Sequence, residues 1–463
     1  MGLFRIFSSQ DSFITNRMFS TSESLRATGS NFGNSPSLHL FKLTGSTPSS
    51  SVELARVLVQ FDLTELSGKI YSDKSIPSSS VSYYMTMFDM QHEDRKPSNY
   101  DVFAYPLSRS WTEGSGIDNE KYRDFGPVNW LSASATATWI VAGSDYLDAT
   151  DYGSGSQHIA DPNSDFEINI TDIVVNWLTG GLPNNGLVVK LGATEENHTT
   201  NSYYIKMLHS RETMFTDRMP FVEARWNNAK KDNRNNFAYN VENKMFMYNI
   251  QRGELTNVSE TVTCRIQDHA VGASSSFTAS FATHQIEPGI LTASITVEFT
   301  GNVQFSASWY DIWESSTRVY MSGNFTPLIL TGSTMDLNSE YVVDVTNLKR
   351  TYSLNEEVRL KASVRQRDYK THKIVHTASF GWGGEYVEKM YYKIINETNG
   401  DVIVPYATGT LPYTQLGYDA SGNYFDLSMN MFSPGTLYRL LFLIDVNKHT
   451  KQEVDGDFIF KVI

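Results

Sequence analysis

Apolar side chains recur at every second position of the run Leu54–Leu63, where Ala55, Val57, Val59 and Phe61 alternate with mostly polar neighbours. Successive side chains of a β-strand point to opposite faces, so this spacing predicts a strand that buries one face. The same alternation returns several times in the second half of the chain. Because strands of this kind are buried by packing one sheet on another, the sequence predicts an all-β protein.

The length and composition of the chain indicate several β-domains. With 463 residues the chain is too long for one compact core, and two to four domains are expected. Charged residues make up only 19%, and many Ser, Thr and Asn residues favour short strands joined by polar turns. We expect a first module over residues 1–228 and a polar linker, unable to bury anything, over 229–237. Two immunoglobulin-like β-sandwich domains are expected over 238–347 and 348–463.

Two hairpins and a central strand are predicted in the last two domains. Leu291–Phe299 and Val303–Trp309 alternate on either side of a Thr-Gly tip, which predicts the first hairpin. Met390–Ile395 and Val402–Tyr406 flank an Asn-Gly pair, which tolerates the positive φ of a tight turn and predicts the second. Thr436–Asp445 is apolar on both faces and is predicted to be a central strand.

Charge and hydropathy exclude several classes of function. A net charge of −13 repels phosphate backbones, so nucleic-acid binding is not expected. No apolar run approaches the roughly 20 residues of a membrane span, and the first residues do not resemble a signal peptide. We therefore expect a protein made in the cytoplasm. The one cysteine, Cys264, lies in an alternating run and is predicted to be an inert core thiol.

No catalytic residues are predicted, and the sequence offers one weak metal site. His372 and His376 are four apart among strand-forming residues, which places them roughly 13 Å apart and too far to share a metal. Asp145, Asp148 and Asp151 lie in a Gly- and Ser-rich loop, and their oxygen ligands suit a structural calcium ion. The alternative, a solvated acidic loop, is favoured, so no cofactor is expected.

The first module resembles a known family. The resemblance rests on six segments in this order and spacing: Leu54–Leu63, Leu107–Glu113, Ile168–Leu178, Asn185–Lys190, His209–Glu212 and Pro220–Trp226. They are similar to bacterial surface and secreted modules named for the signature DNRLRE. The resemblance implies a jelly-roll, carbohydrate-binding-module-like β-sandwich that scaffolds and binds.

A second resemblance concerns both ends of the chain. Near the start are Phe4–Phe7 and Asp11–Ile14; near the end are Tyr391–Pro405, Gly422–Met429, Tyr438–Leu441 and Phe460–Ile463. These segments are similar to virion proteins of contractile-tailed bacteriophages, especially marine ones. The resemblance implies a virion location, with other virion proteins and copies of the chain as partners. It favours the tail, neck or baseplate and leaves capsid decoration open.

Tryptophans of the first module support the alternative function. The resemblance places Trp111 and Trp177 in the core of the fold. Trp130 and Trp139, in the long stretch between Glu113 and Ser164, are the candidates for an exposed platform on which a sugar ring could stack. We therefore expect a non-enzymatic structural virion protein, with a carbohydrate-binding adhesin that contacts host surface polysaccharide as the alternative. A polysaccharide-degrading enzyme is disfavoured because no repetitive β-helix pattern is present.

Overall fold

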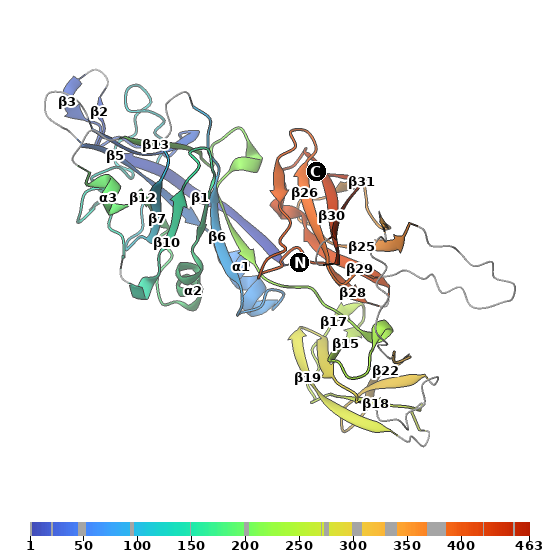
Figure 1. Ribbon diagram of the computed structural model, residues 1–463. Coiled ribbons are helices and arrows are strands. Elements are labelled where there is room, and N and C mark those ends of the chain that lie inside the picture. Colours follow the sequence, from blue (N-terminus) through green and yellow to red (C-terminus); the bar gives the residue numbers. More distant parts are fainter. Residues whose placement is uncertain are drawn as a thin grey trace. The chain divides into compact units, whose positions relative to one another are not determined.

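The protein divides into two compact units, each described here by itself (Figure 1). The N-terminal unit comprises residues 3–68 and 79–225, and the C-terminal unit comprises residues 1–2, 69–78 and 226–463. This computed structural model describes residues 2–19, 22–44, 52–92, 97–148, 150–198, 203–269, 271–272, 277–298, 308–328, 340–367, 386–419, 421–447 and 450–463.

The N-terminal unit is a β-sandwich whose strands all pair antiparallel. One layer has the order β1-β14-β6-β11 and the other has β10-β7-β12-β5-β1, with β4 paired to β5 and to β13. The strands are β1 (Leu3–Thr15), β4 (Ser37–Thr44), β5 (Val52–Phe61), β6 (Ser82–Met87), β7 (Tyr100–Pro106), β10 (Gly155–Ile159), β11 (Phe166–Asn169), β12 (Leu187–Leu191), β13 (Tyr204–His209) and β14 (Phe221–Arg225). Short ribbons β2 (Met18–Phe19) with β3 (Ser22–Arg26) and β8 (Ser132–Ser134) with β9 (Ala137–Thr138) are added to it.

Strand β1 belongs to both layers. Its first half, from Leu3 to Phe7, pairs with β14, and its second half, from Ser8 to Thr15, pairs with β5. The register shifts between Ser8 and Gln10, which is a β-bulge at Ser9. A bulge bends the strand and increases its twist, which allows one strand to leave one layer and join the other.

Strand β5 contains the alternating run that begins at Leu54, and it is buried on both faces. Ala55, Val57 and Val59 face one side as predicted, but Leu58 on the other side is also fully buried. The expectation of one buried face is therefore wrong. The reason is that the long connection between β7 and β10, residues 107–154 (the β7–β10 excursion), packs over that second face and forms a core of its own with Leu58 and Val188.

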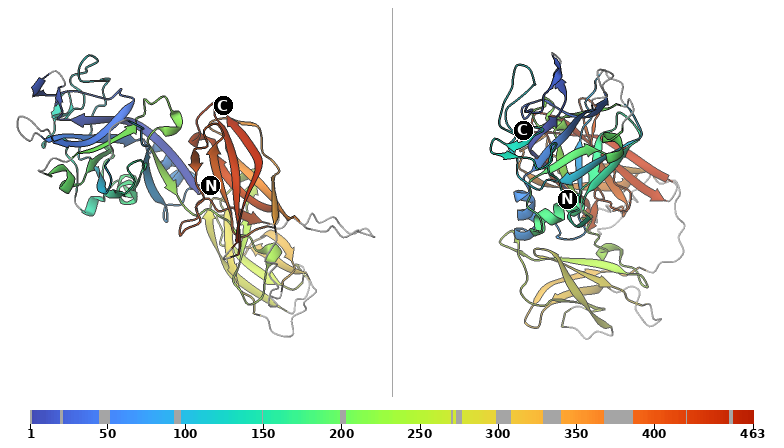
Figure 2. Two further views of the ribbon diagram at one scale, coloured as in Figure 1. Left: turned by 45° about the horizontal axis from the view of Figure 1, so that its top comes forward. Right: turned by 90° about the vertical axis from the view of Figure 1, so that its left-hand side faces the viewer.

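The middle module of the C-terminal unit is built from a six-stranded antiparallel set with the order β15-β20-β19-β18-β21-β22, drawn in yellow-green to light orange (Figure 2). Its strands are β15 (Asn243–Tyr248), β18 (Thr263–Gln267), β19 (Thr278–Glu287), β20 (Ile290–Ile295), β21 (Trp309–Glu314) and β22 (Val319–Phe325), with a small ribbon of β16 (Ile250–Gln251) and β17 (Glu254–Leu255). The core contains Trp309, Trp313 and the predicted core thiol Cys264, all with no exposed surface.

Of the hairpin predicted between Leu291–Phe299 and Val303–Trp309, the described residues include most of the first arm but only Ser308 and Trp309 near the end of the second. Strand β20 pairs with β15 and β19, whereas β21 pairs with β18 and β22. The predicted Thr-Gly tip lies outside the described residues. The alternation located the first arm, which is strand β20, but alternation carries no information on which strands pair.

The last module has two packed sheets, β23-β25-β29-β28 and β24-β31-β30-β26-β27. Their strands are β23 (Tyr341–Val345), β24 (Thr351–Tyr352), β25 (Glu357–Gln366), β26 (Met390–Asn396), β27 (Val402–Val404), β28 (Gly417–Asp419), β29 (Gly422–Ser428), β30 (Leu437–Asn447) and β31 (Thr450–Val462). The hairpin of β26 and β27 is confirmed, with Gly400 at a φ of 76° in its turn. The central strand is confirmed as β30, between β26 and β31.

The predicted polar linker, residues 229–237, is packed against the fold. Lys230 and Asp232 are 4% and 3% exposed, so the expectation that this segment buries nothing is wrong. Arg234, in the short helix η4 (Arg234–Asn236), donates to the carboxylates of Asp232 and Asp311 at 3.0 and 2.8 Å. Lys230 pairs with Glu287 and Asp232 pairs with Arg234, so these charges are buried with partners of opposite sign, which composition does not indicate.

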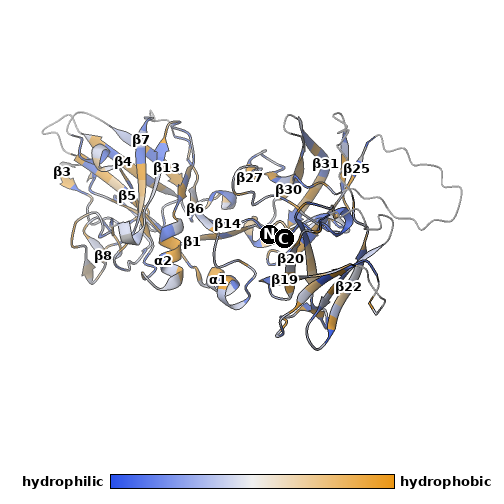
Figure 3. Cartoon of the chain, turned by 60° about the horizontal axis from the view of Figure 1, so that its bottom comes forward, coloured by the Kyte–Doolittle hydropathy of each residue, from blue (hydrophilic) through white to orange (hydrophobic). Residues whose placement is uncertain are grey.

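The predicted all-β class, an N-terminal sandwich followed by immunoglobulin-like modules, is confirmed. Hydrophobic and hydrophilic residues alternate along many strands of both units (Figure 3). The helical elements are short: α1 (Thr64–Ser67), α2 (Thr171–Thr179), α3 (Ala193–Glu196), η1 (Gly68–Ser72), η2 (Thr150–Tyr152), η3 (Thr216–Arg218), η4 and η5 (Met429–Met431). In the part of the chain that the structure describes, none is long and apolar enough to cross a membrane.

Candidate functional site

The predicted sugar-stacking platform is not on the surface. Trp130 and Trp139 are 7% and 5% exposed, so the expectation that they are accessible is wrong. Both belong to the core under the β7–β10 excursion, together with Trp111. The indole N–H of Trp139 donates to the carbonyl of Asn129 at 2.9 Å, and the guanidinium of Arg56 lies over the ring of Trp130. The burial predicted for Trp111 and Trp177 is confirmed.

Asn31 fixes the β7–β10 excursion over the sheet. Its amide nitrogen donates to the carbonyls of Glu113 and Val128 at 2.6 and 2.8 Å, and its amide oxygen accepts from the N–H groups of Gly33 and Gly116. Asn31 itself is completely buried. The side chain of Asn31 therefore forms hydrogen bonds with three separate turns. These bonds hold the long polar stretch over the tryptophans, which is why the tryptophans are buried.

In the acidic loop proposed for calcium, the carboxylate of Asp145 bonds to groups of the protein itself. Asp145 accepts hydrogen bonds of 2.9 Å from the backbone N–H groups of Ile140 and Val141 and forms an ion pair with Arg109. Asp148 is exposed, and the side chain of Asp151 lies outside the described residues. Among the residues described, no group of three or more His, Cys, Asp or Glu side chains could hold a metal ion. His372 and His376 also lie outside the described residues.

A lysine ammonium lies among oxygen ligands in the loop downstream of the proposed calcium site. The Nζ of Lys206 donates to the carbonyls of Pro162 and Ser164 at 2.8 and 2.7 Å and pairs with Asp89 at 2.8 Å. Its side chain is 1% exposed. The oxygen atoms at this place therefore bind the ammonium group of Lys206.

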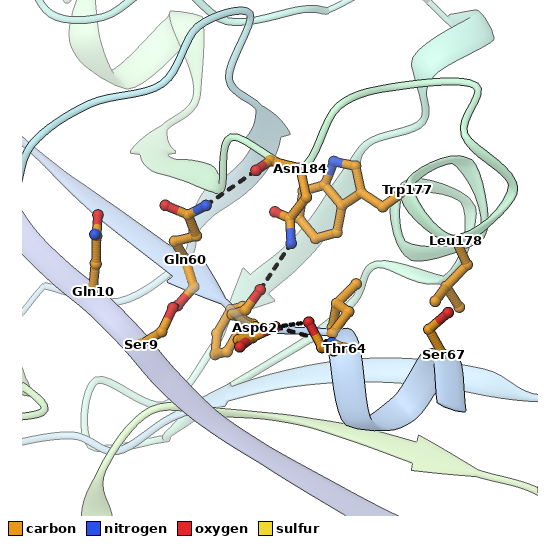
Figure 4. A pocket seen from close by; sticks show the side chains of 11 residues that line it. Ser9, Gln10, Gln60, Asp62, Thr64, Ser67, Trp177, Leu178 and Asn184 are labelled. Carbon is orange, nitrogen blue, oxygen red and sulfur yellow. Dashed lines mark hydrogen bonds between the residues drawn. The ribbon is translucent and has the colours of Figure 1, made fainter. Parts of the chain in front are cut away.

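A polar groove lies at the bulge of β1, in the N-terminal unit (Figure 4). Its volume is about 630 Å³. The lining comes from the bulge, the end of β5, α1, the end of α2 and the turn before β12: Ser9, Gln10, Gln60, Phe61, Asp62, Leu63, Thr64, Ser67, Trp177, Leu178 and Asn184. The lining residues come from three stretches that are far apart in sequence, so no local motif predicted the groove.

The ends of the elements around the groove are held by local hydrogen bonds. The amide of Gln60 donates to the carbonyl of Asn184, whose own amide donates to the carbonyl of Phe61 at 2.8 Å (Figure 4). Asp62 accepts from the N–H and the hydroxyl of Thr64, and these bonds to the charged form lower the pKa of the Asp62 carboxyl. Asp62 is therefore a fixed negative charge at the rim.

Two buried polar atoms of the lining have no protein partner. The indole Nε1 of Trp177 and the side-chain Oε1 of Gln10 are both inaccessible and unbonded. Trp177 lies near the end of α2, which is terminated by Gly180 at a φ of 78°. An unsatisfied buried polar group costs about 1–3 kcal/mol, so such groups are rare and call for an explanation. The indole N–H of Trp177 is a hydrogen-bond donor, and the amide oxygen of Gln10 is an acceptor.

Large apolar side chains are exposed along the β7–β10 excursion. At least 47% of each is accessible, in a connection that otherwise covers the sheet: Tyr122, Phe125, Leu131, Ile140 and Val141. The N–H of Trp139 donates to the carbonyl of Leu131, which closes the β8–β9 ribbon between Leu131 and Ile140. We call these five side chains the apolar excursion residues.

The one cysteine of the chain is not a candidate nucleophile. Burial raises the pKa of the Cys264 thiol, which makes it a poor nucleophile.

Comparison with known proteins does not assign a family. No protein-family model matches the chain, and no curated protein matches it. Among solved structures, tandem Ig repeats of Dlar match at 10% identity and a TM-score of 0.17, covering 50% of this chain and 95% of that one. Dimeric latent PorU from Porphyromonas gingivalis matches at 11% identity and a TM-score of 0.17, covering 92% of this chain and 34% of that one. These values carry no argument about function.

Proposed function

We propose that this chain is a non-enzymatic structural protein of a tailed-bacteriophage virion, where it joins other virion proteins and copies of itself. The tail, neck or baseplate is the favoured location, and capsid decoration is the alternative. The sequence resemblances at Phe4–Phe7 and in the last module supply the virion class. Three successive β-modules offer the large surfaces that permanent interfaces need, which suits an assembly role.

The observation that carries an assembly role is the exposure of the apolar excursion residues. Ile140, Phe125 and Val141 are 81%, 68% and 65% accessible on one connection. Scattered single apolar residues on a surface are ordinary, but large apolar side chains gathered on one segment mark contact surfaces. Protein interfaces are enriched in such aromatic and aliphatic anchors.

The test has two parts. Mass spectrometry of purified particles should find the chain in stoichiometric amounts, and its absence there would exclude the proposal. In a host that supplies the chain in trans, the double change Ile140→Asp and Val141→Asp should reduce incorporation at least tenfold. The matched control is Val402→Asp, which alters a side chain exposed to a similar degree (52%) in the last module and should be incorporated normally.

Carbohydrate binding is the second candidate function. It no longer rests on Trp130 and Trp139, which are core residues. The observation that favours it is the groove at the β1 bulge, whose lining combines amides, hydroxyls, a carboxylate and an indole. Sugar sites typically combine such planar polar groups with an aromatic ring.

A further inference from the structure

We propose that the side chains of Lys206 and Asp89 condense to an amide bond, which forms a covalent link inside the N-terminal unit. Both residues belong to that unit, although they are far apart in sequence. The link is independent of carbohydrate binding and of a place in a virion. It rests on the buried ion pair of the two residues, whose side chains are 1% and 6% exposed.

The two side chains already lie at the distance from which such a bond can form. Lys206 Nζ is 2.8 Å from Asp89 Oδ1, one bond away from the carboxyl carbon. Groups held in a fixed geometry at such a distance react as though they were highly concentrated. The carbonyls of Pro162 and Ser164 hold Nζ there through hydrogen bonds of 2.8 and 2.7 Å. After condensation, the remaining N–H of the amide can still donate to one of these carbonyls.

Pairing of the backbone fixes both residues in register. Asp89 forms an antiparallel bridge with Leu208, and the N–H of Met90 donates to the carbonyl of Met207 at 2.8 Å. Asp89 follows β6, which pairs with β14 and β11, whereas Lys206 is on β13, which pairs with β4. The amide bond would therefore join the two layers of the sandwich covalently, in a chain whose one cysteine cannot form an internal disulfide.

The reaction needs no reagent from outside the chain. A proton passes from the ammonium of Lys206 to the carboxylate of Asp89, which neutralises two buried charges. The lone pair of the neutral nitrogen then attacks the carboxyl carbon and forms a C–N bond. One carboxyl oxygen leaves with two protons as water. An amine and a carboxylic acid thus become an amide and water, with no oxidation or reduction.

A second carboxyl, that of Asp165, is placed to carry protons for this reaction. Its Oδ1 accepts from the backbone N–H of Asp89 at 2.7 Å. Partial burial of the carboxyl and the charge of Asp89 raise the pKa of Asp165. A carboxyl with a raised pKa can take a proton from the attacking nitrogen and return one to the leaving oxygen. Asp165 is itself exposed, so it connects the buried pair to solvent.

Another buried lysine–carboxylate pair of the same unit lacks these conditions. Lys190 Nζ is 3.1 Å from Glu196 Oε2, and both side chains are 7% exposed. Glu196 also accepts hydrogen bonds of 3.0 and 2.7 Å from the guanidinium of Arg56. Two cations beside one carboxylate favour its ionised form, which resists attack by an amine. We expect this pair to remain an ion pair, which makes it a matched control.

The experiment measures the intact mass of the purified full chain under denaturing conditions. We expect a mass below that of the sequence by one water molecule, and a protease digest should contain a branched peptide that joins Asp89 to Lys206. The key variant is Lys206→Arg, which keeps the positive charge but replaces the amine by a poorly nucleophilic guanidinium, so the full mass should return. Because the branched peptide identifies the linked residues directly, the result does not depend on the stability of a variant.

Lys190→Arg is the matched control and should still show the loss of one water molecule. Asp165→Asn should remain mostly at full mass at times when the unchanged chain, made in a cell-free system, is already linked. The proposal would be overturned by full mass in the unchanged chain, by a loss of water that persists in Lys206→Arg, or by a branched peptide at other residues. Linking of Asp165→Asn at an unchanged rate would exclude Asp165 as the proton carrier.

Discussion

The backbone N–H of Arg211 donates a 2.7 Å hydrogen bond to the carboxylate of Asp11, a residue that is 1% exposed. The guanidinium of Arg211 pairs with Glu113 at 3.0 Å, and Glu113 in turn accepts from the N–H of Asp11. Glu113 therefore bonds both to the guanidinium of Arg211 and to the backbone of Asp11, whose own carboxylate bonds to the backbone of Arg211. Burial raises the pKa of Asp11 to about 7, and burial also raises the pKa of Glu113.

The stability of the N-terminal unit should therefore fall as pH rises between about 4 and 7. The folded chain holds a proton on Asp11 in this window, and the unfolded chain releases it near its ordinary pKa of 3.8. Since the native state binds more protons, the free energy of unfolding decreases with pH. Across this pH window, the free energy of unfolding of the unchanged chain should fall by an amount on the order of 2–4 kcal/mol relative to that of the Asp11→Asn variant. Urea titrations at several pH values measure this difference.

Asp118→Asn is the control for the pH experiment. Backbone hydrogen bonds lower the pKa of Asp118, so its contribution is lost only below the window tested. Its stability curve from pH 5 to 8 should run parallel to that of the unchanged chain. If the curve of Asp11→Asn is parallel as well, the buried carboxyl does not carry the proton as described.

Asn31→Ala should release the β7–β10 excursion from the sheet. The change leaves two buried carbonyls and two buried N–H groups without partners, which should cost about 2–4 kcal/mol. Trp130 and Trp139 would then contact water, so their fluorescence should shift to longer wavelength before the unit unfolds. Asn34→Ala, which alters an exposed neighbour, should leave the emission unchanged. An unshifted spectrum for Asn31→Ala would contradict this account.

A chelator should not change the melting temperature of the N-terminal unit. The carboxylate of Asp145 is already bonded to two backbone N–H groups and to Arg109, so its structural role does not need calcium. Asp145→Ala should cost about 1–3 kcal/mol in calcium-free buffer. Calorimetry with and without EDTA checks both statements. A chelator-sensitive transition that Asp145→Ala abolishes would restore the metal hypothesis.

Arg234→Met should destabilise the C-terminal unit. The guanidinium pairs with Asp232 and with Asp311, which is completely buried, so removing it leaves uncompensated charge at a cost of about 3–5 kcal/mol. The double change Arg234→Met and Asp311→Asn should recover part of this loss. Arg252→Met is the control on an exposed arginine. Chemical denaturation followed by circular dichroism measures all three, and equal stability of the two single variants would mean that the segment is a linker after all.

The sequence by itself determined the class of structure and the position of most strands. Alternation along Leu54–Leu63 and the apolar run at Thr436–Asp445 predicted β5 and β30, because the period of two is a local property of the strand. The Asn-Gly pair before Val402 predicted the hairpin of β26 and β27 for the same local reason.

Only the tertiary structure decided which strands pair, which tryptophans are buried and where a ligand could bind. Strand β20 pairs with β15 and β19, and Trp130 is covered because Asn31 holds a connection from more than eighty residues away. Lys230 and Asp232 are buried because their partners, Glu287 and Arg234, neutralise them. Each of these outcomes depends on contacts between segments that are distant in sequence. The residue type at one position does not indicate which distant residue it will contact.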